Sequence, residues 1–150
     1  MTTLPGKIII NGSASGKAIV TQQPINFTGA MCNAQNLLPG KKAVIYDQHH
    51  DLYKASTEGK ILVFPSCIGS THTGLVLLDL VSEGIGPAGM IVQSADSLLV
   101  SGIVLADVWF EKTIPIIEYS GSDLFDHIQS GQRLTLEDKT GNILIDNSIL

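Results

Sequence analysis

The stretch FPSCIGSTHTGLVLLDLVSEG, from Phe64 to Gly84, decides the fold class of this chain. It closes a continuous apolar run, KILVF, which is typical of a strand buried on both faces. Pro65 ends that strand and a loop of small polar residues follows. Leucines then recur at helical spacing as far as Gly84, which stands where a helix C′ glycine belongs. A buried strand, a loop and a helix in this order predict an α/β fold.

The segments on either side predict a mixed sheet. Two β-branched runs, Lys7–Asn11 and Lys17–Thr21, flank the turn GSASG and are interpreted as a hairpin. Residues 22–40 contain Pro and Gly breakers and are expected to be irregular. Further strands are expected at Ala43–Tyr46, Ala88–Gln93 and Ile114–Tyr119, helices at Asp96–Val108 and within Ser120–Gly131, and a closing hairpin around Lys139–Gly141. The middle then forms a parallel sheet, with antiparallel strands at both ends packed on it.

Length and composition limit the classes of function that this chain can have. A chain of 150 residues is expected to form one domain, and its net charge of -5 with scattered cations argues against nucleic acid. No apolar run approaches the roughly 18 residues that span a bilayer, and no signal peptide is visible, so we expect a cytoplasmic protein. Cys32 and Cys67 should then be reduced thiols. The 44% hydrophobic content fits either a partner-covered surface or many buried strands.

The loop GSTHTG is the first candidate site. It lies before a helix N-terminus, where free backbone N–H groups and the helix dipole favour an anion or a developing alkoxide. Ser70 is placed to direct its hydroxyl into such a site, and the same field suits a serine base. The competing interpretation is an ordinary turn whose helix is capped by Thr71 or Thr73. No Gly-Lys-Ser/Thr ends the loop, so it is not a Walker A motif.

Two other groups of side chains could take part in catalysis or metal binding. Cys67 and His72 could form a nucleophile pair, but the simpler interpretation is a buried cysteine and an exposed loop histidine. The run YDQHHD, residues 46–51, could bind a hard metal or orient an acid, although such runs are more often solvated loops. The residues alone therefore predict a soluble α/β domain with one serine loop of interest.

Three segments in order extend this interpretation: NGSASGKAIVTQQPINF, then DQHHDLYKASTEGKILVFPSCIGSTHTGLVLLDLVSEGIGPAGMIV, then LLVSGIVLADVWFEKTIPIIEY. They contain an Asp-x-x-His element, a buried strand ending in Pro and a Gly-Ser loop, and a Leu-rich helix. A Gly-x-x-Pro-Ala strand and an Ile-Pro strand follow. This succession, from Lys7 to Tyr119, resembles the swivel domain, or small subunit, of the aconitase X family.

The resemblance implies a fold and separate roles for two subunits. The fold is the aconitase-type swivelling β/β/α domain, a barrel-like mixed sheet with flanking helices. The swivel closes over a large catalytic subunit in a heterodimer. That subunit carries iron or an iron–sulfur cluster, so this chain alone should bind no metal or other cofactor and should be inactive alone. The reaction is the dehydration of a small hydroxy acid, and Ser70 matches the family's serine base.

The resemblance also suggests the substrate contacts. The expected substrate-binding residues are Gly69, Thr71, Thr73, His50 and Asp47, the last two from the Asp-x-x-His element. The known types act on cis-3-hydroxy-L-proline or on mevalonate 5-phosphate. We expect the first, because no phosphate-reading basic cluster is visible.

The chain also departs from the family pattern. Ile68 replaces an arginine common before Gly-Ser, and Cys32–Asn33 occupy a region that usually holds a Trp-Gly-Gly segment and an Asp. These departures keep open a second hypothesis, a non-catalytic binding or regulatory domain with the swivel fold. A thiol enzyme based on Cys67 is a third.

Overall fold

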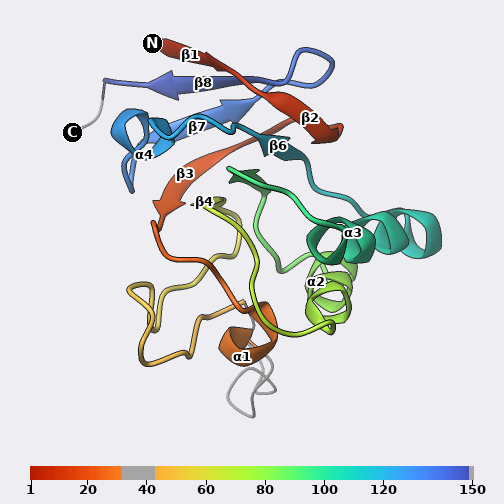
Figure 1. Cartoon of the computed structure of the whole chain (residues 1–150). Coiled ribbons are helices and arrows are strands. Elements are labelled where there is room, and N and C mark those ends of the chain that lie inside the picture. Colours follow the sequence, from red (N-terminus) through yellow and green to blue (C-terminus); the bar gives the residue numbers. More distant parts are fainter. Residues whose placement is uncertain (32–42, 149–150) are drawn as a thin grey trace.

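The computed structural model describes residues 1–31 and 43–148 of the chain. Its strands and helices alternate in the middle of the sequence and strands dominate both ends (Figure 1). In chain order they are β1 (Thr2–Pro5), β2 (Lys7–Ile10), β3 (Ala14–Val20), α1 (Phe27–Met31), β4 (Ile61–Phe64), α2 (Thr73–Ser82), β5 (Gly89–Val92), α3 (Ser97–Phe110), β6 (Ile116–Glu118), α4 (Leu124–His127), β7 (Arg133–Leu136) and β8 (Asn142–Asp146). The predicted mixed α/β fold is confirmed.

The eight strands form one mixed sheet in the order β1-β8-β7-β3-β4-β5-β6-β2. Strands β3, β4, β5 and β6 are parallel, whereas the other pairings are antiparallel. The two strands at opposite ends of this order, β1 and β2, are joined by Gly6 alone. One residue cannot cross an open sheet, because it spans at most about 3.6 Å. The two edges must therefore meet, and the sheet curls into a barrel-like form.

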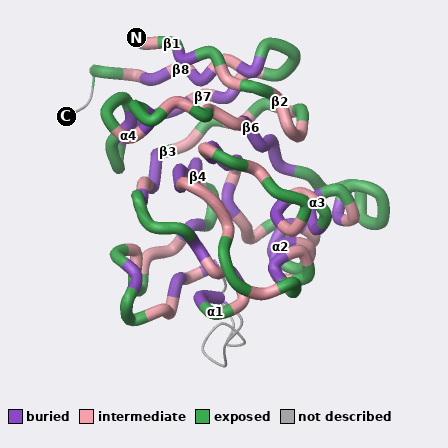
Figure 2. The backbone as a smooth tube through the Cα atoms, in the orientation of Figure 1, coloured by how far each residue is buried: buried purple, intermediate pink, exposed green. Residues whose placement is uncertain are grey.

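The central strands are buried on both faces, and their alternation divides the core in two. In β4, Leu62 and Phe64 pack in a cluster with side chains of α1, α2 and α3. Ile61 and Val63, the alternate residues of the same strand, join a second cluster with β7, β8 and α4. All four are fully buried (Figure 2). The continuous apolar run KILVF was thus correctly interpreted as a strand covered on both sides.

The predicted N-terminal hairpin is wrong. The two strands around GSASG do not pair with each other, because β2 pairs with β6 and β3 lies between β4 and β7. The sequence showed two β-branched runs and a turn, which is the pattern of a hairpin. Closure of the sheet instead places the two strands far apart in strand order, and the connection between them crosses from one part of the sheet to another.

Three other expectations changed in detail. Ala43–Tyr46 is not a strand, since only Val44 forms an isolated bridge, to Ser56. Residues 27–31 are helical although an irregular segment was expected there. The strand β1 was not predicted, because its single buried residue, Leu4, gives too short an apolar pattern to recognise. Cys32–Asn33, where the chain departs from the family pattern, lie outside the described residues.

Helices α2 and α3 cross in close contact beside the sheet (Figure 1). A Cβ atom added at Gly102 would lie 2.0 Å from the carbonyl oxygen of Gly74, at the start of α2. The helix backbones approach this closely only because both residues lack a side chain. The contact fixes the N-terminal turn of α2. In the described ranges, no helix is long and apolar enough to cross a membrane.

The substitution Gly102→Ala tests this contact. In an uncrowded helix, alanine would stabilise the chain by about 1 kcal/mol. Here we expect the free energy of unfolding to fall by about 2 kcal/mol, because the methyl group meets backbone atoms that cannot rotate away. Urea unfolding would measure it. Gly86→Ala is the matched control, since its added Cβ would lie 3.5 Å from its nearest neighbour, Leu80 Cβ. Equal or greater stability of Gly102→Ala would contradict the helix crossing.

Candidate functional site

The loop that follows β4 is fixed to the next strand by its first residue. The carbonyl oxygen of Pro65 accepts hydrogen bonds from the backbone N–H groups of Gln93 and Ser94, at 3.1 and 3.0 Å. Both donors lie just beyond β5, which is parallel to β4. The loop therefore begins as a continuation of the sheet and leaves it at the carboxyl edge of the parallel strands, the usual place for ligand sites in such sheets.

A second segment holds the loop from the other side. Ile25 N–H donates to Ser66 O at 3.1 Å, and Ile68 N–H donates to Ile25 O at 3.0 Å, so Cys67 forms a parallel bridge with Ile25. The next residue, Asn26, faces Gly69. A Cβ at Gly69 would lie 2.5 Å from Asn26 Nδ2, and Gly69 has a φ of +88°, a conformation that favours glycine. Gly69 is therefore a structural requirement of the loop.

Ser70 lies at the end of this fixed loop, one turn before α2. Its Oγ accepts a hydrogen bond from the backbone N–H of His72 at 3.1 Å. The same Oγ lies 3.0 Å from His72 Nδ1. Ser70 is half-buried and His72 is exposed, so the pair is accessible from solvent. Backbone and imidazole thus converge on one hydroxyl oxygen.

Neither threonine caps the helix as the sequence suggested. α2 begins at Thr73, His72 occupies the N-cap position, and no side chain caps the helix there. Thr73 is fully buried, and its Oγ1 donates to the Ser70 carbonyl oxygen at 3.0 Å. Thr73 therefore supports the backbone of Ser70 from beneath. Thr71 and Gly69 are exposed beside Ser70. Of the predicted contacts, these two are the ones that the structure brings to the surface around the serine.

Cys67 is part of the frame under the loop. Burial raises the pKa of its thiol to about 12, and the nearby carboxylate of Asp96 adds to the effect. Asp96 in turn caps α3, where its Oδ1 accepts from Leu99 N–H at 2.9 Å. A thiol with this pKa is protonated at neutral pH and is a poor nucleophile. Cys67 was expected to be buried; it is half-buried, and its environment still disfavours the thiolate.

Asp47 and His50 lie in a separate turn. Asp47 Oδ1 accepts from His49 N–H at 2.9 Å, which closes the turn. The buried His50 ring accepts from Leu52 N–H through Nδ1 at 3.1 Å, and its buried Nε2 has no partner among the residues that the structure describes. The neighbouring Asp51 accepts from Thr21 Oγ1, at the end of β3, at 2.7 Å. In the described part of the chain, neither Asp47 nor His50 shares a hydrogen bond with the Ser70 loop.

The segment that contains the loop carries acidic side chains but no basic one. Residues 61–110, which include β4, the serine loop, α2, β5 and α3, contain no lysine or arginine. Ile68 stands 52% exposed before Gly69, in the position where the family pattern has a cation. Among residues 1–31 and 43–148, no group of three or more His, Cys, Asp or Glu side chains could hold a metal ion.

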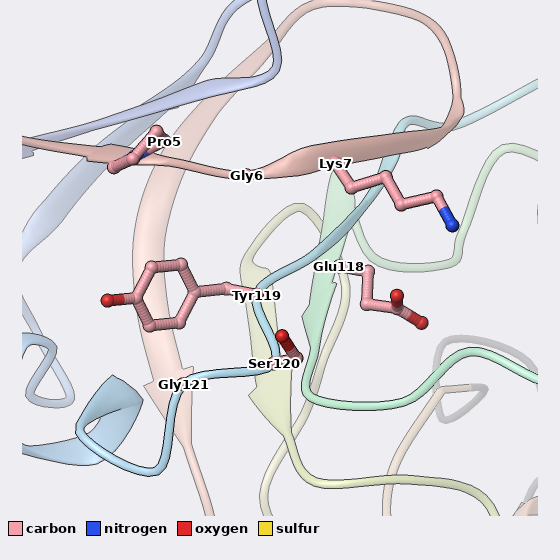
Figure 3. Close-up of a pocket in the computed structure, with 7 residues that line it drawn as sticks. All are labelled: Pro5, Gly6, Lys7, Glu118, Tyr119, Ser120 and Gly121. Carbon is pink, nitrogen blue, oxygen red and sulfur yellow. The ribbon is translucent and has the colours of Figure 1, made fainter.

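A shallow pocket of about 430 Å³ lies elsewhere, where the chain passes from β1 to β2 and leaves β6 (Figure 3). Its side chains include Lys7, Glu118 and Tyr119. Figure 3 shows the Lys7 and Glu118 side chains extending to the same side, with the Tyr119 ring directed away from them. Glu118 Oε2 is already held by the N–H of Ala95, at 2.8 Å. None of the sequence-predicted site residues lines this pocket.

Sequence reasoning missed two residues of the serine loop. His72 was interpreted as an exposed loop histidine, yet it contacts Ser70 through both its backbone and its ring. Asn26 lies more than forty positions away from Gly69 in the chain, and only the fold brings the two together. The one available signal for His72 was its position two residues after Ser70. It could have been noticed as an ordinary turn around a serine hydroxyl.

Comparisons with known proteins agree with this architecture. The family model for the aconitase X swivel domain matches residues 3–145. The phosphomevalonate dehydratase small subunit of Pyrococcus furiosus is 28% identical over 142 residues, covering 95% of this chain and 94% of that one. The corresponding protein of Thermococcus onnurineus is 29% identical over 143 residues, covering 95% and 98%.

A solved structure shows the same fold. The crystal structure of Thermococcus kodakaraensis aconitase X in its holo-form superposes with a TM-score of 0.81. It is 25% identical in sequence, and the match covers 98% of this chain and all of that chain. The barrel-like sheet, the serine loop at its carboxyl edge and the family match lead to one conclusion: the chain belongs to the aconitase X swivel domain family.

Proposed function

We propose that this chain is the small subunit of a heterodimeric hydro-lyase that removes water from a small hydroxy acid, and that Ser70 is its base. The observation that carries the proposal is the position of Ser70 Oγ before α2, where the backbone N–H of His72 donates to it at 3.1 Å. The relatives named as dehydratase small subunits support the assignment of the chain as a dehydratase small subunit.

The geometry suits proton abstraction next to a carboxylate. A serine hydroxyl is a weak base unless its surroundings stabilise the alkoxide. The N–H donor on Oγ and the positive end of α2 both favour negative charge at this oxygen. Exposed Thr71 and the N–H groups around Gly69 are proposed to hold the substrate carboxylate. Thr73 is proposed to act by supporting the loop, and His50 and Asp47 to contact substrate once the complex is closed.

The large subunit completes the site in this proposal. It would carry the iron or iron–sulfur centre, which supplies Lewis-acid chemistry to the leaving hydroxyl. Two large apolar side chains flank the serine loop on this chain: Ile68 is 52% exposed and Leu75 is 60% exposed. Exposed apolar groups beside a functional loop are typical of a surface that a partner covers. We therefore place the large subunit against the face that presents Ser70.

The substrate assigned here is cis-3-hydroxy-L-proline. The absence of lysine and arginine from residues 61–110 supports this choice, because a phosphate ester usually meets a cation. The specific observation that favours a second candidate, mevalonate 5-phosphate, is the name shared by the relatives described above. Assay of the purified complex with both compounds decides between them.

The first prediction concerns Ser70→Ala in the complex with the large subunit. We expect turnover to fall at least about a hundredfold, since general acid–base groups commonly contribute that much. The isolated small subunit should show no turnover. Ser122→Ala is the matched control, because Ser122 is exposed in another part of the chain. Unchanged turnover in Ser70→Ala would reject the serine base and favour a non-catalytic regulatory domain.

The second prediction concerns the partner-facing surface. Ile68→Glu places a charge where we expect apolar contact, so the dissociation constant of the two subunits should rise about tenfold or more. Isothermal titration calorimetry or analytical ultracentrifugation would measure it. The fold should be unaffected, because the Ile68 side chain is exposed in the isolated chain. Wild-type affinity would show that the large subunit binds elsewhere.

The third prediction tests the thiol-enzyme alternative. With its pKa raised to about 12, the Cys67 thiol should be largely protonated at pH 8, and its alkylation by iodoacetamide should be roughly a hundredfold slower than that of free cysteine. The Cys32→Ser background isolates the Cys67 signal in mass spectrometry. Unfolding in urea should restore normal reactivity. Rapid alkylation of the folded chain would contradict this prediction and support the hypothesis that Cys67 is a nucleophile.

A further inference from the structure

We infer that His72 positions the Ser70 hydroxyl and holds its proton, so that the two residues work as a serine–histidine pair. This inference rests on the proposed role of Ser70 as base. Its geometric support is that two separate atoms of His72 meet the same Oγ: the backbone N–H at 3.1 Å and the ring Nδ1 at 3.0 Å.

The directions of the two hydrogen bonds follow from what each group can donate. The backbone N–H of His72 can only donate, so Oγ accepts there. Oγ has one proton of its own, and Nδ1 is the partner within reach. We assign the hydroxyl as the donor to Nδ1, which places the ring hydrogen on Nε2. This arrangement leaves Oγ with a donor that stabilises negative charge and an acceptor that can take its proton.

The proton balance of the reaction can be followed atom by atom. The Ser70 O–H proton passes to His72 Nδ1, which gives an alkoxide and an imidazolium. The alkoxide removes the proton next to the substrate carboxylate, and the electron pair of the broken C–H bond forms the double bond as hydroxide leaves. The imidazolium then gives its proton to that hydroxide, directly or through solvent. The substrate has lost one water molecule, and both side chains have returned to their first states.

The surroundings leave this role to the imidazole. Within the described ranges, Ser70 Oγ has hydrogen bonds to His72 alone. Thr73 hydroxyl is committed to the Ser70 carbonyl oxygen, and the Asp96 carboxylate caps α3. The half-buried Cys67 thiol keeps its proton because its pKa is about 12. No lysine or arginine of residues 61–110 is present to stabilise an alkoxide by charge. A proton acceptor beside the hydroxyl compensates for that missing cation.

His72→Asn separates a proton-holding role from a structural one. Asparagine is a favoured N-cap residue, so α2 should be as stable as before or more stable. Its amide oxygen can accept a hydrogen bond from Ser70, but an amide cannot take up a proton at neutral pH. A residue that only shaped the turn would therefore tolerate this change. A proton holder would not.

Kinetics of the two-subunit complex provide the first measurement. For His72→Asn we expect kcat to fall about a hundredfold with KM within about twofold of wild type, because the lost interaction acts in the chemical step. His49→Asn is the matched control, since the His49 side chain is exposed in the turn of residues 47–50. Wild-type kcat for His72→Asn, together with an inactive Ser70→Ala, would overturn the pair and leave the proposed function intact. An active Ser70→Ala would overturn both.

A second measurement uses the isolated chain and does not depend on activity. In imidazole ¹⁵N spectra, we expect Ser70→Ala to change the chemical shift of His72 Nδ1, which loses its hydrogen-bond donor, while the His49 ring stays the same. An unchanged Nδ1 resonance would show that Ser70 does not donate to the ring and would overturn the inference, whatever the kinetics of the complex.

Discussion

Burial of β4 on both faces is the constraint on which the rest of the structure depends. Its four side chains are inaccessible to solvent, two facing the helices and two facing the inside of the curled sheet. At about 25 cal/mol per Å² of apolar surface, this is a strong driving force for placing the strand at the centre. A strand in that position cannot itself carry polar chemistry. The polar residues of the segment must therefore follow the strand, and they gather at its carboxyl end in the serine loop.

The loop is held in place by ordinary backbone hydrogen bonds. Pro65, Ser66 and Ile68 extend the sheet by one layer of hydrogen bonds to neighbours on both sides. Only after these bonds does the chain turn through Gly69 and reach Ser70. The close approach of α3 to Gly74 fixes the other end. Ser70 thus sits between two anchored points, and the proposed role as a base would require such pre-organisation.

The sequence predicted the parts of this arrangement that depend on local patterns. The buried strand KILVF, the helix that ends before Gly84 and the helix expected over Asp96–Val108 each show a pattern within a single segment. The N-terminal hairpin was wrong because strand pairing is a property of the whole sheet. The run around GSASG cannot show that β2 belongs beside β6 and β3 beside β4. Closure through Gly6 decides this pairing, and no short window of sequence contains it.

The candidate site shows the same limit on a smaller scale. Ser70 could be selected from its place before a helix, but the N-cap assignment to Thr71 or Thr73 failed because the Thr73 hydroxyl donates backward to Ser70 O. Ser70 Oγ is hydrogen-bonded instead to the backbone N–H and to the ring Nδ1 of His72. Thr73 therefore holds the backbone of Ser70 in place, while the serine hydroxyl remains hydrogen-bonded to His72. A buried threonine thereby supports the backbone that carries the serine proposed as the base.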